Sequence, residues 1–194
     1  MGQIPMPGGW SMAAMWLPMC GQSWPGAAAG FTGMWGAMMV PMMLPLAVAP
    51  LLDYRAALDG RWRPLLLTAA AGLAWAATWT ALGLPVYLTG AAVAQALLNT
   101  PALARTMPVM AALAGVAGAA WHLAAWHRRP VPLRLAGPPV CAAALRHGAR
   151  LGGHCVRRCA GLTVALLAAG IMERSTMVCA FAVVVAESVR LRER

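Results

Sequence analysis

The chain has 194 residues, of which 61% are hydrophobic and only 10% are charged, and its mean hydropathy is +0.66. A water-soluble domain needs more charged residues than this on its surface. The composition therefore excludes that class and predicts an integral membrane protein. The net charge is +10 and every basic residue is arginine. The arginines lie between apolar runs, a pattern that indicates membrane topology and no nucleic-acid partner.

Five apolar runs predict an all-α fold, a polytopic protein of about five transmembrane helices. A Met- and Trp-rich segment, residues 1–25, is expected to lie on the outer membrane surface, and residues 26–194 are expected to form a single helical membrane domain. Pro41, Pro45 and Pro50 predict a kink in the first span. The expected spans are 26–52, 65–93, 108–126, 160–172 and 177–189.

The arginines concentrate in alternate connections between the spans. Segment 53–63 holds three and segment 127–158 holds seven, whereas no arginine precedes the first span. Because basic residues stay on the cytoplasmic side, the two segments are expected to be cytoplasmic loops. This pattern predicts an outer N-terminus, a cytoplasmic C-terminus and a place in the bacterial inner membrane.

Charged residues lie in or next to the last two expected spans, where lipid cannot solvate their side chains. Glu187 lies inside the fifth expected span, and an ionisable group there requires a partner. Arg190, three residues later, is the expected one. Arg157 and Arg158 precede the fourth span and are expected to extend toward the lipid headgroups.

Ten of the fourteen methionines lie in the first 43 residues. Met38, Met39, Met42 and Met43 form the densest group, inside the first expected span. Thioethers suit soft Cu(I), whereas magnesium and calcium prefer oxygen donors, but unbranched methionines also fill gaps between helices. The group therefore predicts either a copper site or interhelical packing. Further soft donors, spaced like a loose collar in the outer segment, are Met6, Met12, Met15, Met19 and Cys20.

A second candidate metal site is formed by His154, Cys155 and Cys159. The two cysteines are one turn apart on a helix, so their thiols share a face, and the histidine can join them. Copper and zinc both accept such nitrogen and sulfur donors. The structural alternative is two small buried cysteines and an interfacial histidine.

Short motifs along nearly the whole chain carry a resemblance to a known family. They are Pro7-Gly8-Gly9-Trp10, Gly21-Gln22-Ser23-Trp24, the run from Met38 to Pro45, and His147-Gly148 followed by Gly152, His154, Cys155, Cys159 and Gly161-Leu162. In these motifs the chain resembles the bacterial predicted metal-binding integral membrane proteins grouped as domain of unknown function 2182. The resemblance implies a multi-span helical protein whose Cys, His and Met residues bind metal. One departure is Arg158, which stands where the family tends to carry a second, adjacent cysteine.

The leading hypothesis is an integral membrane protein that binds or relays a soft metal ion, with copper favoured over zinc. The alternative is a non-catalytic structural or assembly subunit of a membrane complex. Expected partners are the lipid bilayer and another membrane or metal-handling protein, and no arrangement typical of a catalytic site predicts an enzyme. The methionines are expected near mid-membrane and the His-Cys segment toward the cytoplasm, so the two groups form one site or two stations of a transfer path. The metal ligands expected on this hypothesis are Met38, Met39, Met42, Met43, His154, Cys155 and Cys159.

Overall fold

The structure is a computed structural model that describes residues 2–19, 21–58, 63–126, 140–170 and 174–192. Within these residues the chain forms five α-helices, as expected. Three of them, α1 to α3, are long and apolar enough to cross a membrane. Membrane crossing by the other two helices is still a prediction. The same holds for the expected outer N-terminus. The helices are α1 (Trp24–Ala56), α2 (Pro64–Asn99), α3 (Pro101–Trp126), α4 (Cys141–Ala169) and α5 (Arg174–Arg192).

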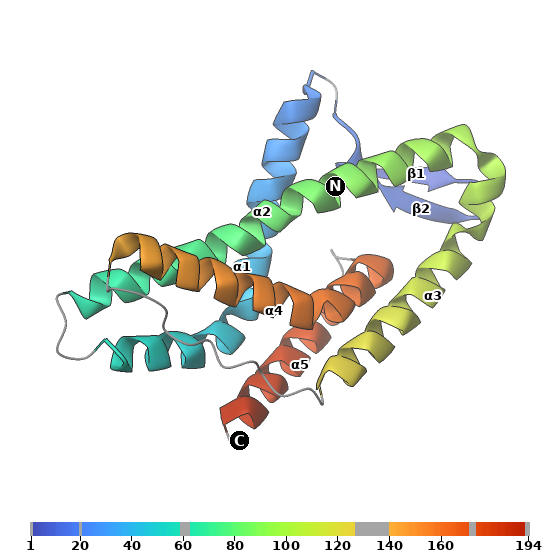
Figure 1. The fold of residues 1–194 in the computed structure, drawn as a ribbon. Coiled ribbons are helices and arrows are strands. Elements are labelled where there is room, and N and C mark those ends of the chain that lie inside the picture. The colour runs from blue at the N-terminus through green and yellow to red at the C-terminus, as the bar shows by residue number, and fades with distance from the viewer. Residues whose placement is uncertain (1, 20, 59–62, 127–139, 171–173, 193–194) are drawn as a thin grey trace.

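A small antiparallel β-hairpin, which the sequence did not predict, precedes the helices (Figure 1). Gly8 and Gly9 close its turn with φ angles of 108° and 78°, which glycine adopts without strain. The Trp10 Nε1–H group donates to the Ala104 carbonyl oxygen at 2.9 Å and so joins the hairpin to α3. The elements of this segment are β1 (Gln3–Met6), β2 (Trp10–Ala13) and the 3-10 turn η1 (Ala14–Trp16).

Helix α1 contains three prolines in its second half. Its N-terminus is capped by Ser23, whose Oγ accepts a hydrogen bond from the Gly26 N–H group at 3.3 Å. Pro41, Pro45 and Pro50 each lack the backbone donor that an unbroken helix needs. Figure 1 shows that α1 changes direction along its length, which agrees with the expected kink.

Helix α2 is the longest element, and both α1 and α4 pack along it. The chain reverses at Thr100, and α3 then packs mainly on α4, while α5 packs mainly on α1. Gly118 of α3 lies directly against Gly161 of α4, since a Cβ added to Gly118 would lie 2.6 Å from the Gly161 carbonyl oxygen. Small residues at this crossing let the two backbones approach closely.

Helix α4 begins well before the expected fourth span, 160–172. The expected cytoplasmic loop 127–158 is helical from Cys141 onward. The prolines that would break a helix all precede Cys141, and the residues after it are mostly good helix formers. Arg146 and Arg150 lie on the exposed face of this new first half. The remainder of the expected loop, residues 127–139, lies outside the described part of the chain.

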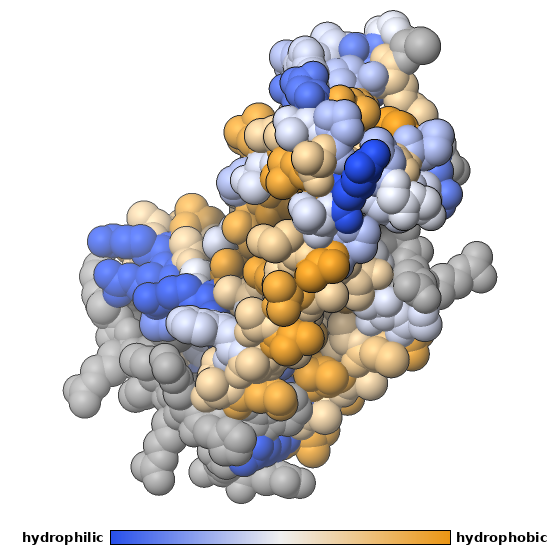
Figure 2. Space-filling view, turned by 90° about the vertical axis from the view of Figure 1, so that its right-hand side faces the viewer, coloured by the Kyte–Doolittle hydropathy of each residue, from blue (hydrophilic) through white to orange (hydrophobic). Residues whose placement is uncertain are grey.

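The outer faces of α2 and α3 expose large apolar side chains. Leu73 of α2 is 71% exposed and Val116 of α3 is 69% exposed. Figure 2 shows apolar side chains gathered over the middle of one face, with hydrophilic ones toward its ends. A surface of this kind suits contact with lipid.

Candidate metal centre

Helix α1 turns one row of side chains toward the centre of the protein. Residues four apart share a face of a helix, and every member of this row is buried. The row consists of Phe31, Trp35, Met39, Met43 and Ala47. Met42, on the adjacent row, is buried as well, whereas Met38 is half-buried and packs at the edge of the same cluster. The helical period therefore places Met39, Met42 and Met43 in the interior and leaves Met38 at its edge.

Helix α4 brings two thiols to the same place. Cys155 and Cys159 are buried, one turn apart, as their spacing predicts. Two glycines on the same side of α4 let it lie very close to α2: a Cβ on Gly148 would overlap the Ala71 carbonyl oxygen, and one on Gly152 would lie 2.7 Å from the Thr78 Cβ. Side chains larger than hydrogen at these positions would hold the cysteines away from α2.

Two tryptophans of α2, Trp75 and Trp79, lie in the same buried cluster as Cys155 and Cys159. Their indole N–H groups are buried and, within the described residues, make no hydrogen bond. Trp35 holds this arrangement from α1, because its Nε1–H group donates to the Trp79 carbonyl oxygen at 3.0 Å. Buried donors without a full partner suit a sulfur atom that carries negative charge.

The methionines and the cysteines belong to one contiguous buried cluster, although they lie more than 100 residues apart in sequence. We call this set the sulfur cluster; its members are Met39, Met42, Met43, Cys155 and Cys159. The indole rings of Trp75 and Trp79 complete its walls. Five of the seven expected ligands therefore belong to one connected cluster of buried side chains.

The other two expected ligands, His154 and Met38, are not among the buried members of the sulfur cluster. His154 is half-buried, and its Nδ1 atom lies 3.1 Å from an Nη atom of Arg157. Because it precedes Cys155 by one residue, it is turned roughly 100° away from the thiol on the helix. Met38 packs against the outside of the cluster, as described above.

The donor set of the cluster is entirely sulfur. Among the described residues, no three side chains of the His, Cys, Asp and Glu types come together as a metal site. A zinc site needs about four such ligands in a tetrahedral arrangement, which two cysteines alone do not supply. Thiolate and thioether sulfur together suit Cu(I), which accepts few ligands.

A buried charged group lies next to the cluster and joins three helices. Glu187 of α5 is 1% exposed, and its Oε1 atom accepts a hydrogen bond from the Arg158 Nε–H group of α4. The His122 Nε2 atom of α3 lies 3.6 Å from the other carboxylate oxygen. The packing of α4 on α5 thus supplies Glu187 with a partner that the sequence did not predict, Arg158. Of the two arginines expected at the headgroups, Arg157 is exposed but Arg158 turns inward.

The outer methionines do not form the single collar that their spacing suggests. Met6 and Met12 are buried beneath the hairpin, Met15 is half-buried, and Met19 is 60% exposed. Cys20 lies outside the described residues.

The fold and the sulfur cluster together define a helical protein with three helices that could span a membrane and with a buried cluster rich in sulfur side chains. A family model described as "PpoB2: Copper chaperone" matches residues 32–194, and the chain belongs to that family. The expectation of a metal-related family is thereby confirmed in general terms, and the family's description names copper. A search of curated proteins and a search of solved structures found no match.

Proposed function

We propose that this chain is a membrane-embedded Cu(I) chaperone, and that copper is its cargo. The thiolates of Cys155 and Cys159 bind the ion, and Met39 and Met43 are the thioether ligands. Met42 is an alternative thioether ligand in the same cluster. The observation that carries the proposal is that thioethers of α1 and thiols of α4 belong to one connected cluster of buried side chains. The copper chaperone family to which the chain belongs supports the choice of metal.

The surroundings of the cluster suit a transferable ion. The two thiols lose their protons when they bind copper, and the buried, unpaired indole N–H groups of Trp75 and Trp79 in the same cluster are donors suited to negative sulfur. Cu(I) moves between sulfur ligands by exchange and keeps its oxidation state, so passing the ion on needs no redox partner. We place this site in the bacterial inner membrane, with five spans and a cytoplasmic C-terminus, on the arginine pattern. The motif resemblance to domain of unknown function 2182 supports the same assignment.

Copper content of the purified protein tests this function. Wild-type protein in detergent, loaded anaerobically with Cu(I) and passed through a desalting column, is expected to retain copper at about one tightly bound ion per chain. The variant Cys155→Ser/Cys159→Ser is expected to lose that ion. The matched control is Cys141→Ser/Cys179→Ser, which changes two exposed cysteines and keeps the ion. Equal copper in all three proteins would refute the proposal and favour the structural-subunit alternative.

A further inference from the structure

A buried group of ionisable side chains joins three helices, and the proposed copper site does not use it. Its members are His122 of α3, Arg158 of α4 and Glu187 of α5. His122 is 3% exposed and Glu187 is 1% exposed. Ionisable groups in the interior of a membrane protein are costly, and they commonly mark the paths of ions and protons. The group therefore points to a role in handling charge.

The sequence and the packing place this group beside the thiol of Cys159. Arg158 directly precedes that cysteine on α4. Val184 of α5 belongs to the same connected cluster of buried side chains as Cys159. Glu187 follows Val184 by three residues and so lies on the same face of α5. A change of charge at the thiol is therefore felt by the carboxylate.

The side chain of His122 lies close to the Glu187 carboxylate but is not hydrogen-bonded to it. Its Nε2 atom is 3.6 Å from the Glu187 Oε2 atom, beyond ordinary hydrogen-bond length. Oε2 has no hydrogen-bond partner among the described residues, whereas Oε1 accepts from the Arg158 Nε–H group. The backbone of His122 is held against α4, since a Cβ added to Gly161 would lie 2.8 Å from its nitrogen. A proton on Nε2 would give Oε2 the donor that it lacks.

Copper loading changes the net charge of this region. The ion brings one positive charge, while the two thiols lose one proton each, so the interior gains one net negative charge. Uncompensated charge in the interior is costly. Arg158 cannot supply the balance alone, because it is already paired with Glu187. Retention of one of the two protons on His122 makes loading electrically neutral.

Charged groups of the neighbouring helices set when His122 takes up that proton. Helix α4 brings Arg158, which disfavours a second positive charge, together with the thiol of Cys159. Helix α5 brings Glu187, which favours it, and the half-buried Arg190 one turn further on. The neighbouring turns of α3 that the structure describes carry no charged side chain. The new negative charge at Cys159 is thus what favours the imidazolium.

We infer that His122 is the proton acceptor of copper loading, an inference that rests on the proposed function. Two S–H bonds break and two Cu–S bonds form at Cys155 and Cys159. One proton goes to Nε2 of His122, which then pairs with Glu187, and the other leaves to water. Copper keeps its oxidation state. Passing the ion on reverses these steps, so each transfer exchanges a single proton with water.

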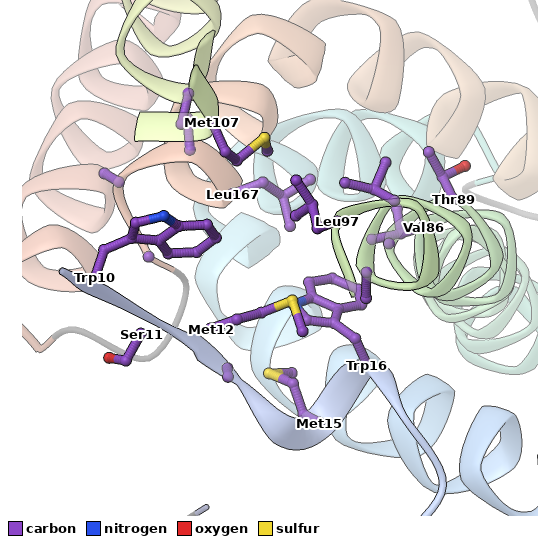
Figure 3. A pocket seen from close by; sticks show the side chains of 18 of the residues that line it. Trp10, Ser11, Met12, Met15, Trp16, Val86, Thr89, Leu97, Met107 and Leu167 are labelled. Atoms are coloured by element: carbon purple, nitrogen blue, oxygen red, sulfur yellow. The ribbon is translucent and has the colours of Figure 1, made fainter. Parts of the chain in front are cut away.

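The proton count has to be assigned to one ion. The other methionine-containing region, the cavity of about 1000 Å³ beneath the hairpin, is open and lined almost wholly by apolar side chains. Figure 3 shows Met107 across this cavity from Met12 and Met15. This lining does not suit a bound cation. The protons are therefore counted against the ion of the sulfur cluster.

Protons released per copper ion test the inference. Full-length protein in detergent and weak buffer at neutral pH receives Cu(I) anaerobically as its acetonitrile complex, and an indicator dye reports the protons. Wild type is expected to release about one proton per retained ion, and His122→Gln about two. The control is His147→Gln, at a half-buried histidine stacked on Tyr54 of α1, which is expected to release about one.

The pH dependence of Cu(I) affinity gives a second measure that a purely structural role of His122 would not change. Between about pH 7 and pH 8, the wild-type affinity is expected to rise about tenfold for each pH unit, because one net proton is released. For His122→Gln the rise is expected to be about a hundredfold for each pH unit, because two are released. Competition with a chromophoric chelator that does not titrate in this range measures both.

The outcomes separate this inference from the proposed function. Two protons per ion in wild type, or equal counts in wild type and His122→Gln, would overturn the inference and leave the copper site standing. The wild-type count and pH dependence decide alone if His122→Gln does not fold. A wild-type protein that retains no copper would contradict the proposed function and this inference together.

Discussion

Arg158 of α4 and Glu187 of α5 form an ion pair in which the carboxylate is 1% exposed, and Arg158 directly precedes Cys159 in the sequence. The pair therefore fixes the turn of α4 that carries one of the proposed copper ligands. His122 adds a contact from α3, so three helices meet at one carboxylate. Breaking such a pair leaves an uncompensated charge in the interior.

Removal of one partner of this pair is expected to destabilise the protein strongly. Arg158→Gln leaves the buried Glu187 carboxylate uncompensated on that side and should lower the free energy of unfolding by about 3–5 kcal/mol. Arg158→Met/Glu187→Leu removes both charges and should recover most of that loss. Thermal unfolding in detergent measures the difference, with Arg157→Met at an exposed position as the control. A double variant as unstable as Arg158→Gln would contradict the expected compensation.

Close packing of α4 on α2 predicts a sharp contrast between neighbouring glycines. Gly148→Ala places a Cβ onto the Ala71 carbonyl oxygen and should cost about 1–3 kcal/mol of stability. It should also weaken Cu(I) binding, because Cys155 moves away from α2. Gly153→Ala is the control, since nothing lies within 4 Å of its added Cβ. Unfolding temperature and Cu(I) affinity measured together check both effects, and equal behaviour of the two variants would show that the close approach is unimportant.

The methionine row predicts which thioethers matter for copper. Met39→Leu/Met43→Leu preserves volume in the cluster but removes both proposed thioether ligands, and should weaken Cu(I) binding by about tenfold or more. Met38→Leu and His154→Gln change residues outside the cluster and should alter the affinity by less than about threefold. Chelator competition measures each affinity. A larger loss of Cu(I) affinity for His154→Gln than for Met39→Leu/Met43→Leu would indicate that copper binds at the surface of α4 and not in the sulfur cluster.

The arginine pattern predicts the side on which α4 begins. Cys141 is exposed at the first residue of α4, inside the segment 127–158 that is expected in the cytoplasm. In a variant whose other four cysteines are serine, a membrane-impermeant maleimide is expected to label Cys141 in inside-out vesicles but not in intact cells stripped of their outer membrane. Labelling of the intact cells would reverse the topology.

The five helices and the buried pair of cysteines could be expected from the sequence, because both depend on local patterns. Long apolar runs define helices, and a spacing of four residues places Cys155 and Cys159 on one face whatever surrounds them. The same period shows that Met39 and Met43 share a face. Only the packing on α2 decides that this face, and not that of Met38, is turned inward.

Other features depend on contacts between distant segments and could not be read from the sequence. Arg190 is the nearest arginine to Glu187 in sequence, and the crossing of α4 and α5 brings Arg158 to the carboxylate from a different helix. Trp75 and Trp79 are one turn apart, but nothing local indicates that they share a buried cluster with Cys155 and Cys159. Met107 lines the same cavity as Met12 and Met15 because the hairpin packs on α3.

X-ray absorption at the copper edge of the loaded protein tests the central claim most directly, because it reports the atoms bound to the ion. The account predicts Cu(I) with a shell of sulfur only, at about three atoms per ion, and loss of that shell in Cys155→Ser/Cys159→Ser. A shell containing nitrogen or oxygen, or an unchanged sulfur shell in the variant, would contradict it.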